Sequence, residues 1–354
     1  MVGSIHKFPD ENTRIIPMQR VRDSGHQYIE WCSGRKQVEI VAVDLDHITT
    51  PLSAIDLPVE PIDLIYDRRH GLAVYCRGDT IYFTTLLPRE GEDPVQMEQK
   101  ANIAPGSRIT RLSTSSSGDF ILGMGATMEG FPLVVLYPGV SQGEEHSLVL
   151  VSDNDGNEDS HTLVTGIVGR YGSQALPRQS TLQITVLTAV NLPDAVYIRG
   201  MILYDNNTIA CSSMTRLPDA TSVKYIAQSR DCFVIIVQAT CKDMRTGAIY
   251  DAFFQLNSNL DIVAVVPVSC PDIRPELCSI SDTGGFITGL CKQEDVWMKF
   301  SINFIASSWE CTRNTYGIAE DKEVVQYIEM PFPLPNKSLA MYTTSTSMHI
   351  FDVE

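Results

Sequence analysis

Several segments of the chain carry residue types at spacings that could support chemistry. Gly139, Ser141 and Gly143 match the G-x-S-x-G pattern, in which a strained strand-to-helix turn exposes a nucleophilic serine beside its base. The residues that follow, EEHSLVLVSDNDG, predict a charged loop and then a strand, with no helix to hold such a turn. We therefore interpret this segment as a loop after a strand and expect no catalytic serine.

A second segment is rich in oxygen ligands. Asp153, Asp155, Asn157 and Asp159 alternate within SDNDGNEDS, and oxygen atoms packed this closely could bind a hard cation such as Ca²⁺. Gly156 stands at the wrong position for an EF-hand loop, and no glutamate occupies the twelfth position. The pattern favours a solvated acidic loop and leaves Ca²⁺ binding open.

The candidate cofactor and metal motifs lack the neighbouring elements or the ligand spacing that such sites need. Gly166, Gly169 and Gly172 fall between predicted strands with no helix after them, so they do not predict a dinucleotide site. The histidines are not paired at metal-ligand spacing, and the nine cysteines contain no C-x-x-C pair. We interpret His70 and His146 as ordinary loop residues. The sequence thus predicts no catalytic residue, no cofactor and no metal.

Composition and charge restrict the class of protein. The 354 residues carry a formal net charge of −16, which should repel phosphate backbones and argues against direct nucleic-acid binding. The segment MVGSIHKFPDENTR lacks the apolar run of a signal peptide, and no run of apolar residues is long enough to predict membrane insertion. We expect a cytoplasmic or nuclear protein, and we interpret its cysteines as buried thiols.

The elements that must position any site are predicted to be strands. Short apolar runs rich in Val, Ile, Leu, Tyr and Phe are each closed by Gly, Asp, Ser or Asn turn clusters, and only residues 94–103 and 320–328 suggest helices. A unit of strand, tight turn, strand, loop and strand recurs roughly every 40 to 60 residues, the period of four-stranded propeller blades. We therefore predict an all-β fold, a single seven-bladed β-propeller domain over residues 1–354. Its blades should span residues 16–57, 61–104, 108–152, 161–215, 222–268, 275–313, and 324–354 plus 4–8.

The fourth unit is the least regular. Its second strand is placed near residues 174–176, and the apolar run at residues 181–190 is assigned as its third strand. Six or eight blades are the alternatives to seven.

Two strands and one turn carry a family resemblance. MHIFDV (348–353) and VEIVAVDL (38–45) resemble the strand that ends in Trp-Asp in WD40 repeats, and SDTGGF (281–286) resembles the Ser-Pro-Asp-Gly turn of that family. No Trp-Asp dipeptide occurs, and a Gly-His pair occurs only at Gly25 and His26, so we do not expect the side-chain network of those repeats. The resemblance implies a divergent WD40-like propeller. It also implies that an N-terminal strand, residues 4–8 (SIHKF), pairs with the last blade and closes the ring.

Partner binding is expected at the loops of such a fold. Basic and acidic residues balance in the loops at both ends of the predicted blades, so the excess acidity lies elsewhere, in insertions at residues 90–98 and 144–159. Our hypothesis is that these form an acidic lip for a basic peptide or domain, the alternative being merely soluble loops. The six carboxylates of the second insertion are Glu144, Glu145, Asp153, Asp155, Glu158 and Asp159.

Tryptophans are the other candidates for partner contacts, because exposed tryptophan is enriched in binding hot spots. Trp31, Trp297 and Trp309 stand in or beside predicted strands, which favours packing in the core or between blades.

The function that these observations favour is a noncatalytic scaffold or adaptor subunit of a hetero-oligomeric complex, since WD40-like propellers mostly act in this way. The alternative is a glycan-binding or glycan-hydrolysing propeller of the lectin or sialidase type. The Asp-box turn of sialidases is not matched, because Ser281 stands directly beside Asp282 and no tryptophan follows.

Overall fold

A computed structural model describes most of the chain, and the part described falls into two compact units. Unit 1 comprises Met1–Pro61, Cys270–Ser281 and Gly285–Glu354, and unit 2 comprises Ile62–Ser269 and Asp282–Gly284. The expectation of one domain over the whole chain stays a prediction. The described residues are 4–11, 13–21, 25–44, 46–68, 70–87, 96–114, 120–130, 132–138, 148–152, 162–170, 184–192, 195–203, 209–229, 234–269, 273–281, 283–313, 318, 322–331 and 338–353.

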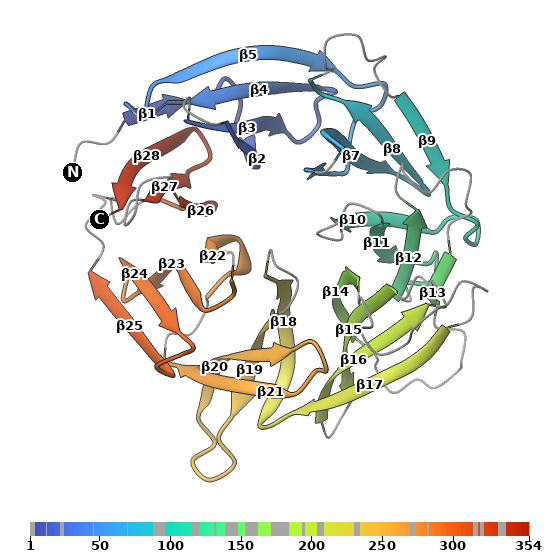
Figure 1. Ribbon diagram of the computed structural model, residues 1–354, viewed down its shortest axis with the longest axis vertical. Helices are drawn as coiled ribbons and strands as arrows, with labels where there is room; N and C mark the ends of the chain where they lie inside the picture. Colours follow the sequence, from blue (N-terminus) through green and yellow to red (C-terminus); the bar gives the residue numbers. More distant parts are fainter. Residues whose placement is uncertain are drawn as a thin grey trace, which may run out of the picture. The chain divides into compact units, whose positions relative to one another are not determined.

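Unit 2 consists of four-stranded antiparallel sheets whose strands follow the chain order (Figure 1). Within each sheet, every strand pairs antiparallel with the next one along the chain. In order, the four sheets are β6 (Asp63–Asp67), β7 (Leu72–Arg77), β8 (Thr80–Thr85) and β9 (Gln96–Lys100); β10 (Arg108–Thr114), β11 (Phe120–Ala126), β12 (Pro132–Pro138) and β13 (Leu148–Ser152); β14 (Thr162–Arg170), β15 (Ile184–Leu192), β16 (Ala195–Leu203) and β17 (Ile209–Leu217); and β18 (Ala220–Gln228), β19 (Val234–Lys242), β20 (Ile249–Asn257) and β21 (Ile262–Val268).

Unit 1 contains three further sheets of the same kind. Two of them follow the chain order, and the third takes one strand from the beginning of the chain. The sheets are β2 (Thr13–Val21), β3 (Gly25–Cys32), β4 (Gln37–Val43) and β5 (Thr49–Asp56); β22 (Cys278–Ile280), β23 (Phe286–Gln293), β24 (Val296–Asn303) and β25 (Ser308–Arg313); and β26 (Gln326–Pro331), β27 (Ser338–Thr343), β28 (Ser347–Val353) and β1 (Ser4–Lys7).

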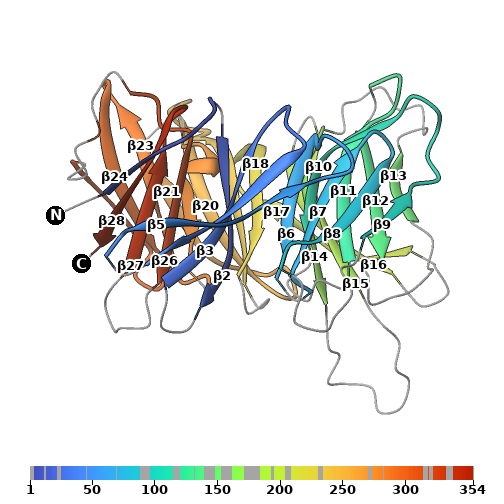
Figure 2. The same cartoon turned by 90° about the horizontal axis from the view of Figure 1, so that it is seen from above.

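The N-terminal strand β1 is the fourth strand of the last sheet. It pairs antiparallel with β28, with Ser4 opposite Ile350 and His6 opposite Met348. In Figures 1 and 2, β28 lies beside β27, which in turn lies beside β26. The SIHKF segment therefore forms the strand pair that we expected of it.

The helices expected from the sequence are wrong where the structure describes those residues. Residues 96–100 form strand β9, which pairs with β8, and residues 322–325 are an irregular segment that leads into β26. Pairing with a neighbouring strand outweighs the weak helix preference of QMEQK. Within the described residues the one helical element is η2 (Pro275–Leu277), a single 3₁₀ turn.

The fourth sheet also differs from our expectation. The apolar run assigned as its third strand lies in β15, which pairs with both β14 and β16 and is therefore the second strand. Residues 174–176, where the second strand was expected, lie outside the described residues. The sequence predicts a turn at GRYGS (169–173) and places Gly166 and Gly169 between strands, but both glycines lie in β14, which continues to Arg170.

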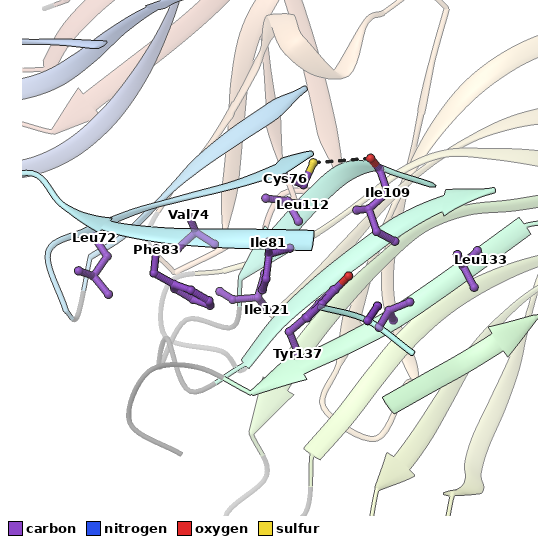
Figure 3. Packing of buried hydrophobic residues seen from close by; sticks show 12 residues of the cluster. Leu72, Val74, Cys76, Ile81, Phe83, Ile109, Leu112, Ile121, Leu133 and Tyr137 are labelled. Atoms are coloured by element: carbon purple, nitrogen blue, oxygen red, sulfur yellow. Dashed lines mark hydrogen bonds between the residues drawn. The ribbon is translucent and has the colours of Figure 1, made fainter. Parts of the chain in front are cut away.

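Buried side chains join neighbouring sheets face to face within unit 2. Figure 3 shows Val74, Ile81 and Phe83 of the β6–β9 sheet beside Ile121 and Tyr137 of the next sheet. Every one of these residues is at most 1% exposed. At about 25 cal/mol per Å² of apolar surface removed from water, such contacts are the main stabilisation of packed sheets.

In unit 1 the last sheet is packed on both of its faces. Ile350 belongs to a cluster shared with Tyr28 of the β2–β5 sheet, whereas Tyr342 belongs to a cluster shared with Trp297 of the β22–β25 sheet. No single sheet could bury both faces alone, so each sheet depends on its neighbours.

Candidate functional site

A groove of about 1310 Å³ lies within unit 1, where several segments of the chain meet. It is formed by the β23–β24 hairpin, the end of β25, the η2 turn and the segment before β26. Its described lining consists of residues 292–298 of the hairpin together with Arg274, Leu277, Arg313, Lys322 and Glu323.

The hairpin at one end of the groove has a tight turn. Glu294 and Asp295 both have positive φ angles, 46° and 67°, and Gln293 pairs with Val296 on either side of them. Two successive positive φ angles are the signature of a type I′ turn, which matches the strand twist but favours Asn and Gly. The hairpin therefore holds two carboxylates at its tip at some cost in backbone strain.

The opposite wall is fixed by bonds from side chains to the main chain. The indole Nε1 of Trp297 donates to the carbonyl oxygen of Lys322 at 2.9 Å, and the guanidinium Nη2 of Arg274 donates to the carbonyl oxygen of Val324 at 2.6 Å. Val324 itself is fully buried. Residues 322–324 are thus held against β24 and η2 although they form no regular structure.

The floor of the groove is apolar. Leu277 and Trp297 are 2% and 4% exposed and belong to the cluster that joins this sheet to the last one, and the half-buried Met298 continues the lining. Gly289 allows Leu277 to approach β23, because a Cβ at that position would collide with the Leu277 carbonyl oxygen and the Phe300 ring. An apolar side chain could be accommodated against this floor.

Two basic residues of the groove have acidic partners at its edge. Nη1 of Arg274 lies 3.3 Å from Oε1 of Glu323, and Nζ of Lys292 lies 3.5 Å from Oδ1 of Asp295. Both carboxylates are largely exposed, at 78% and 91% of the side chain, so these pairs contribute little to stability.

The other two basic residues, Arg313 and Lys322, have no ion pair or side-chain hydrogen bond within the described part of the chain. Lys322 also affects the pKa of His349 on β28. Burial lowers this pKa, and the positive charge of Lys322 lowers it further. With four basic and three acidic residues, the described lining of the groove has a net charge of +1, in a chain of net charge −16.

A second group of titratable residues lies where β1 meets the β2–β5 sheet. Nε2 of His6 lies 2.8 Å from Oε1 of the buried Glu30, to which the Tyr28 hydroxyl also donates at 3.1 Å. Nδ1 of His6 lies 3.1 Å from the Thr49 hydroxyl. Hydrogen bonding to Glu30 raises the pKa of His6, burial lowers it, and the charges of Glu30 and Glu39 raise it further.

Further contacts near the start of β1 complete this arrangement. The Ser4 hydroxyl donates to the His47 carbonyl oxygen at 2.7 Å, and Nε2 of His47 lies 3.0 Å from Oδ1 of Asp352 on β28. These contacts hold the N-terminal strand in place, so we assign this group a structural role.

The site residues expected from the sequence are not part of the described structure. Residues 139–147 and 153–161 lie outside it, and so do residues 90–95 of the first acidic insertion. The serine motif, the possible Ca²⁺ loop and the acidic lip therefore stay predictions. The residues concerned are Ser141, Glu144, Glu145, His146, Asp153, Asp155, Asn157, Glu158 and Asp159.

The tryptophans were interpreted as packing residues, and this is confirmed for Trp31, which is 1% exposed on β3. Trp297 packs in the core and also supports the groove, whereas Trp309 on β25 is half-buried. His70 lies in the turn after β6, with Nδ1 2.6 Å from Oδ2 of Asp67, in agreement with a loop role.

The cysteines were interpreted as buried thiols, which is correct for Cys76, Cys241 and Cys291. It is wrong for Cys32, Cys278 and Cys311, which are half-exposed. The last of these lies on β25, an edge strand of its sheet, where a side chain is covered from one side only.

Sequence reasoning missed the groove itself. Its basic residues come from η2, β23, β25 and the segment before β26, which lie far apart in the sequence. Among them, only Lys292 was noticed, as one of several charges in the loops between strands. No local motif links them, because they are brought together only by sheet packing.

Among the described residues, no group of three or more His, Cys, Asp or Glu side chains is placed to hold a metal ion. A search of the same residues found no helix with the length and hydropathy needed to span a bilayer.

Comparisons by sequence find no relative: no family model matches the chain, and no curated protein matches it. Comparison of structures does find similar folds. The WD40 domain of Toxoplasma gondii coronin aligns with a TM-score of 0.53 at 9% identity, covering 99% of this chain and 86% of that chain. Hydrazine synthase from Kuenenia stuttgartiensis aligns with a TM-score of 0.49 at 8% identity, covering 88% and 97%.

At such low identity these similarities concern the fold alone, and we base the assignment on the coronin domain. The four-stranded antiparallel sheets packed face to face agree with it. The chain has the fold of a WD40-like β-propeller.

Proposed function

We propose that the chain is a noncatalytic scaffold or adaptor subunit of a hetero-oligomeric complex and that a partner protein docks in the unit 1 groove. The observation that carries this proposal is the groove itself: the half-buried apolar residues Val296 and Met298 lie among charged residues in its lining, and residues 322–324 are fixed by hydrogen bonds. An apolar centre with a polar rim is the usual composition of protein interfaces, in which tryptophan and arginine are enriched.

The chemistry of the lining supports binding rather than catalysis. The described residues of the groove include no serine, cysteine, histidine or tyrosine, so the nucleophile–histidine pairs of common hydrolases have no counterpart among them. The glycan-processing alternative is not favoured by the similarity to the coronin domain. Our proposal therefore assigns the chain no enzymatic activity.

The proposal includes the arrangement of the whole chain. We infer that the chain is a single propeller domain whose N-terminal strand completes the last blade, and the pairing of β1 with β28 supports this. Such a ring would present the groove on a rigid support, because each sheet is held by its neighbours. The expected compartment is the cytoplasm or the nucleus.

The test is affinity purification of the tagged full-length chain from its native cells, compared with a groove variant. R313E/K322E reverses the two charges that have no ion pair among the described residues, and K242E/R245E is the matched control, because Lys242 and Arg245 are exposed at the β19–β20 hairpin of unit 2. We expect a stoichiometric partner that the control retains and the groove variant loses. Equal recovery of that partner with R313E/K322E would refute docking in the groove.

A further inference from the structure

The charge distribution of the groove indicates what kind of segment it accepts, and this inference rests on the proposed function. We propose that the groove binds an acidic, extended segment of the partner, with an apolar side chain between its carboxylates. The apolar side chain would lie against Val296 and Met298, and the carboxylates would contact Arg313 and Lys322.

The size and openness of the groove suit a peptide segment. Its volume of about 1310 Å³ exceeds the roughly 300 to 1,000 Å³ of small-molecule pockets. The apolar surface open to a bound segment is that of the half-buried Val296 and Met298, which lie on the same strand as the fixed Trp297, so no rearrangement is needed to present it. A preformed floor lowers the entropic cost of ordering a bound segment.

The sign of the charge comes from the unpaired basic residues. Arg313 ends β25 and Lys322 stands on the fixed wall, and neither has a partner among the described residues. Arginine binds carboxylates in a bidentate manner, and lysine acts as a point charge. A segment with two or more carboxylates could therefore pair with both Arg313 and Lys322.

A basic segment fits less well. Its charges would lie beside Arg313 and Lys322, and the carboxylate of Asp295 at the hairpin tip is already close to Lys292. The acidic lip expected from the sequence would favour a basic partner. Its residues, 90–98 and 144–159, are not among the described residues of the groove, so the lip and the groove can be tested with separate variants.

The net charge of −16 does not cancel this local preference. At physiological ionic strength the Debye length is about 8 Å, so distant carboxylates are screened and the charges lining the groove dominate. The net charge should instead slow association, since long-range attraction is absent.

The hairpin tip provides a variant that should bind more tightly. E294N/D295G removes two negative charges, frees Lys292 from its pair with Asp295, and places Asn-Gly in the type I′ turn that favours it. The net charge of the groove lining then rises from +1 to +3. Because this variant should also have a higher free energy of unfolding, a change in its affinity cannot be attributed to a disrupted fold.

Binding is measured by fluorescence anisotropy with short labelled peptides. The acidic probe alternates Glu and Asp around a central Phe and Leu, and the basic probe carries Lys in place of each acidic residue. We expect the acidic probe to bind the full-length chain and the basic probe not to bind the groove. At about 0.15 M salt, R313E/K322E should weaken acidic binding about tenfold, E294N/D295G should strengthen it about threefold, and K242E/R245E should leave it unchanged.

The inference is overturned if the basic probe binds more tightly than the acidic one, or if R313E/K322E leaves acidic binding unchanged. A photo-crosslinker in the groove, Val296→p-benzoylphenylalanine, separates this failure from that of the proposed function. A native partner that crosslinks through a neutral or basic segment keeps the docking function and refutes the acidic occupant. If the acidic probe binds as expected but R313E/K322E keeps its native partner, the groove chemistry stands and the proposed function fails.

Discussion

The contact between His6 and Glu30 holds the N-terminal strand, and its contribution to the free energy of unfolding should depend on pH. The substitution that tests this is H6Q, which removes the titratable ring but keeps a side chain able to hydrogen-bond. In the folded chain Nε2 of His6 lies 2.8 Å from Oε1 of Glu30, and the two side chains are 21% and 4% exposed.

The expected loss follows from the burial of Glu30. Removing one partner of a buried ion pair costs about 3–5 kcal/mol, because the other charge is left unpaired. His6 is partly exposed, and the Tyr28 hydroxyl still donates to Glu30 after the substitution. We therefore expect a loss of about 2 kcal/mol in the free energy of unfolding, or about 3 °C in Tm for a chain of this length.

The loss should be largest at low pH. Hydrogen bonding to Glu30 is the largest cause that raises the pKa of His6 above 6.5, and it outweighs burial, which lowers that pKa. Because the folded-state pKa lies above the unfolded one, the stabilisation is complete below pH 6.5 and is lost as the pH rises through the folded-state value. The difference between wild type and H6Q should therefore shrink between about pH 5.5 and pH 9.

Urea unfolding followed by tryptophan fluorescence at both pH values measures this difference. H6K is the matched control, because it keeps a positive charge throughout this range and should remove most of the pH dependence. The double variant H6Q/E30Q should show a coupling energy at low pH that falls at high pH. An equal loss for H6Q at both pH values, or no coupling to Glu30, would refute the charged contact.

Other predictions concern single groups. Burial, aided by Lys322, lowers the pKa of His349, so the unfolded chain binds that proton more readily and stability should fall below pH 6.5; H349F should flatten this decline in acid unfolding curves, and an unchanged slope would contradict it. E294N/D295G relieves two positive φ angles and should raise the free energy of unfolding by about 1 kcal/mol in urea titrations, whereas a loss would argue against the type I′ turn. Burial raises the pKa of Cys76 and of Cys241 to about 12, so neither thiol should react with iodoacetamide at neutral pH until the chain is denatured; mass spectrometry of the native protein would reveal any early labelling.

The positions of many strands could be predicted because their signals are local. The strand expected at residues 348–353 is β28, which begins one residue earlier at Ser347, and the strand expected at residues 38–45 is β4 (Gln37–Val43). In each case a turn cluster precedes β-branched or aromatic residues, and such runs favour extended structure wherever they stand.

Errors arose where the local signal was weak or misleading. Residues 96–100 have helix-favouring side chains but pair with β8, and the turn signal near Arg170 displaced the numbering of strands in the fourth sheet. Pairing between strands is decided by the neighbouring strand, which a local pattern does not contain.

The sequence by itself determined that the chain is all-β, roughly where many of the second and third strands of the sheets lie, and that the segment around His6 would pair with the last sheet. Only the tertiary structure decided where a partner could dock. The groove exists because Trp297 and Arg274 bind the main chain of residues 322–324, and because sheet packing brings Arg313 and Lys322 to the same lining. Alternating apolar residues specify a strand through short-range conformational preference, whereas a binding surface depends on contacts between residues distant in the chain, which only packing can establish.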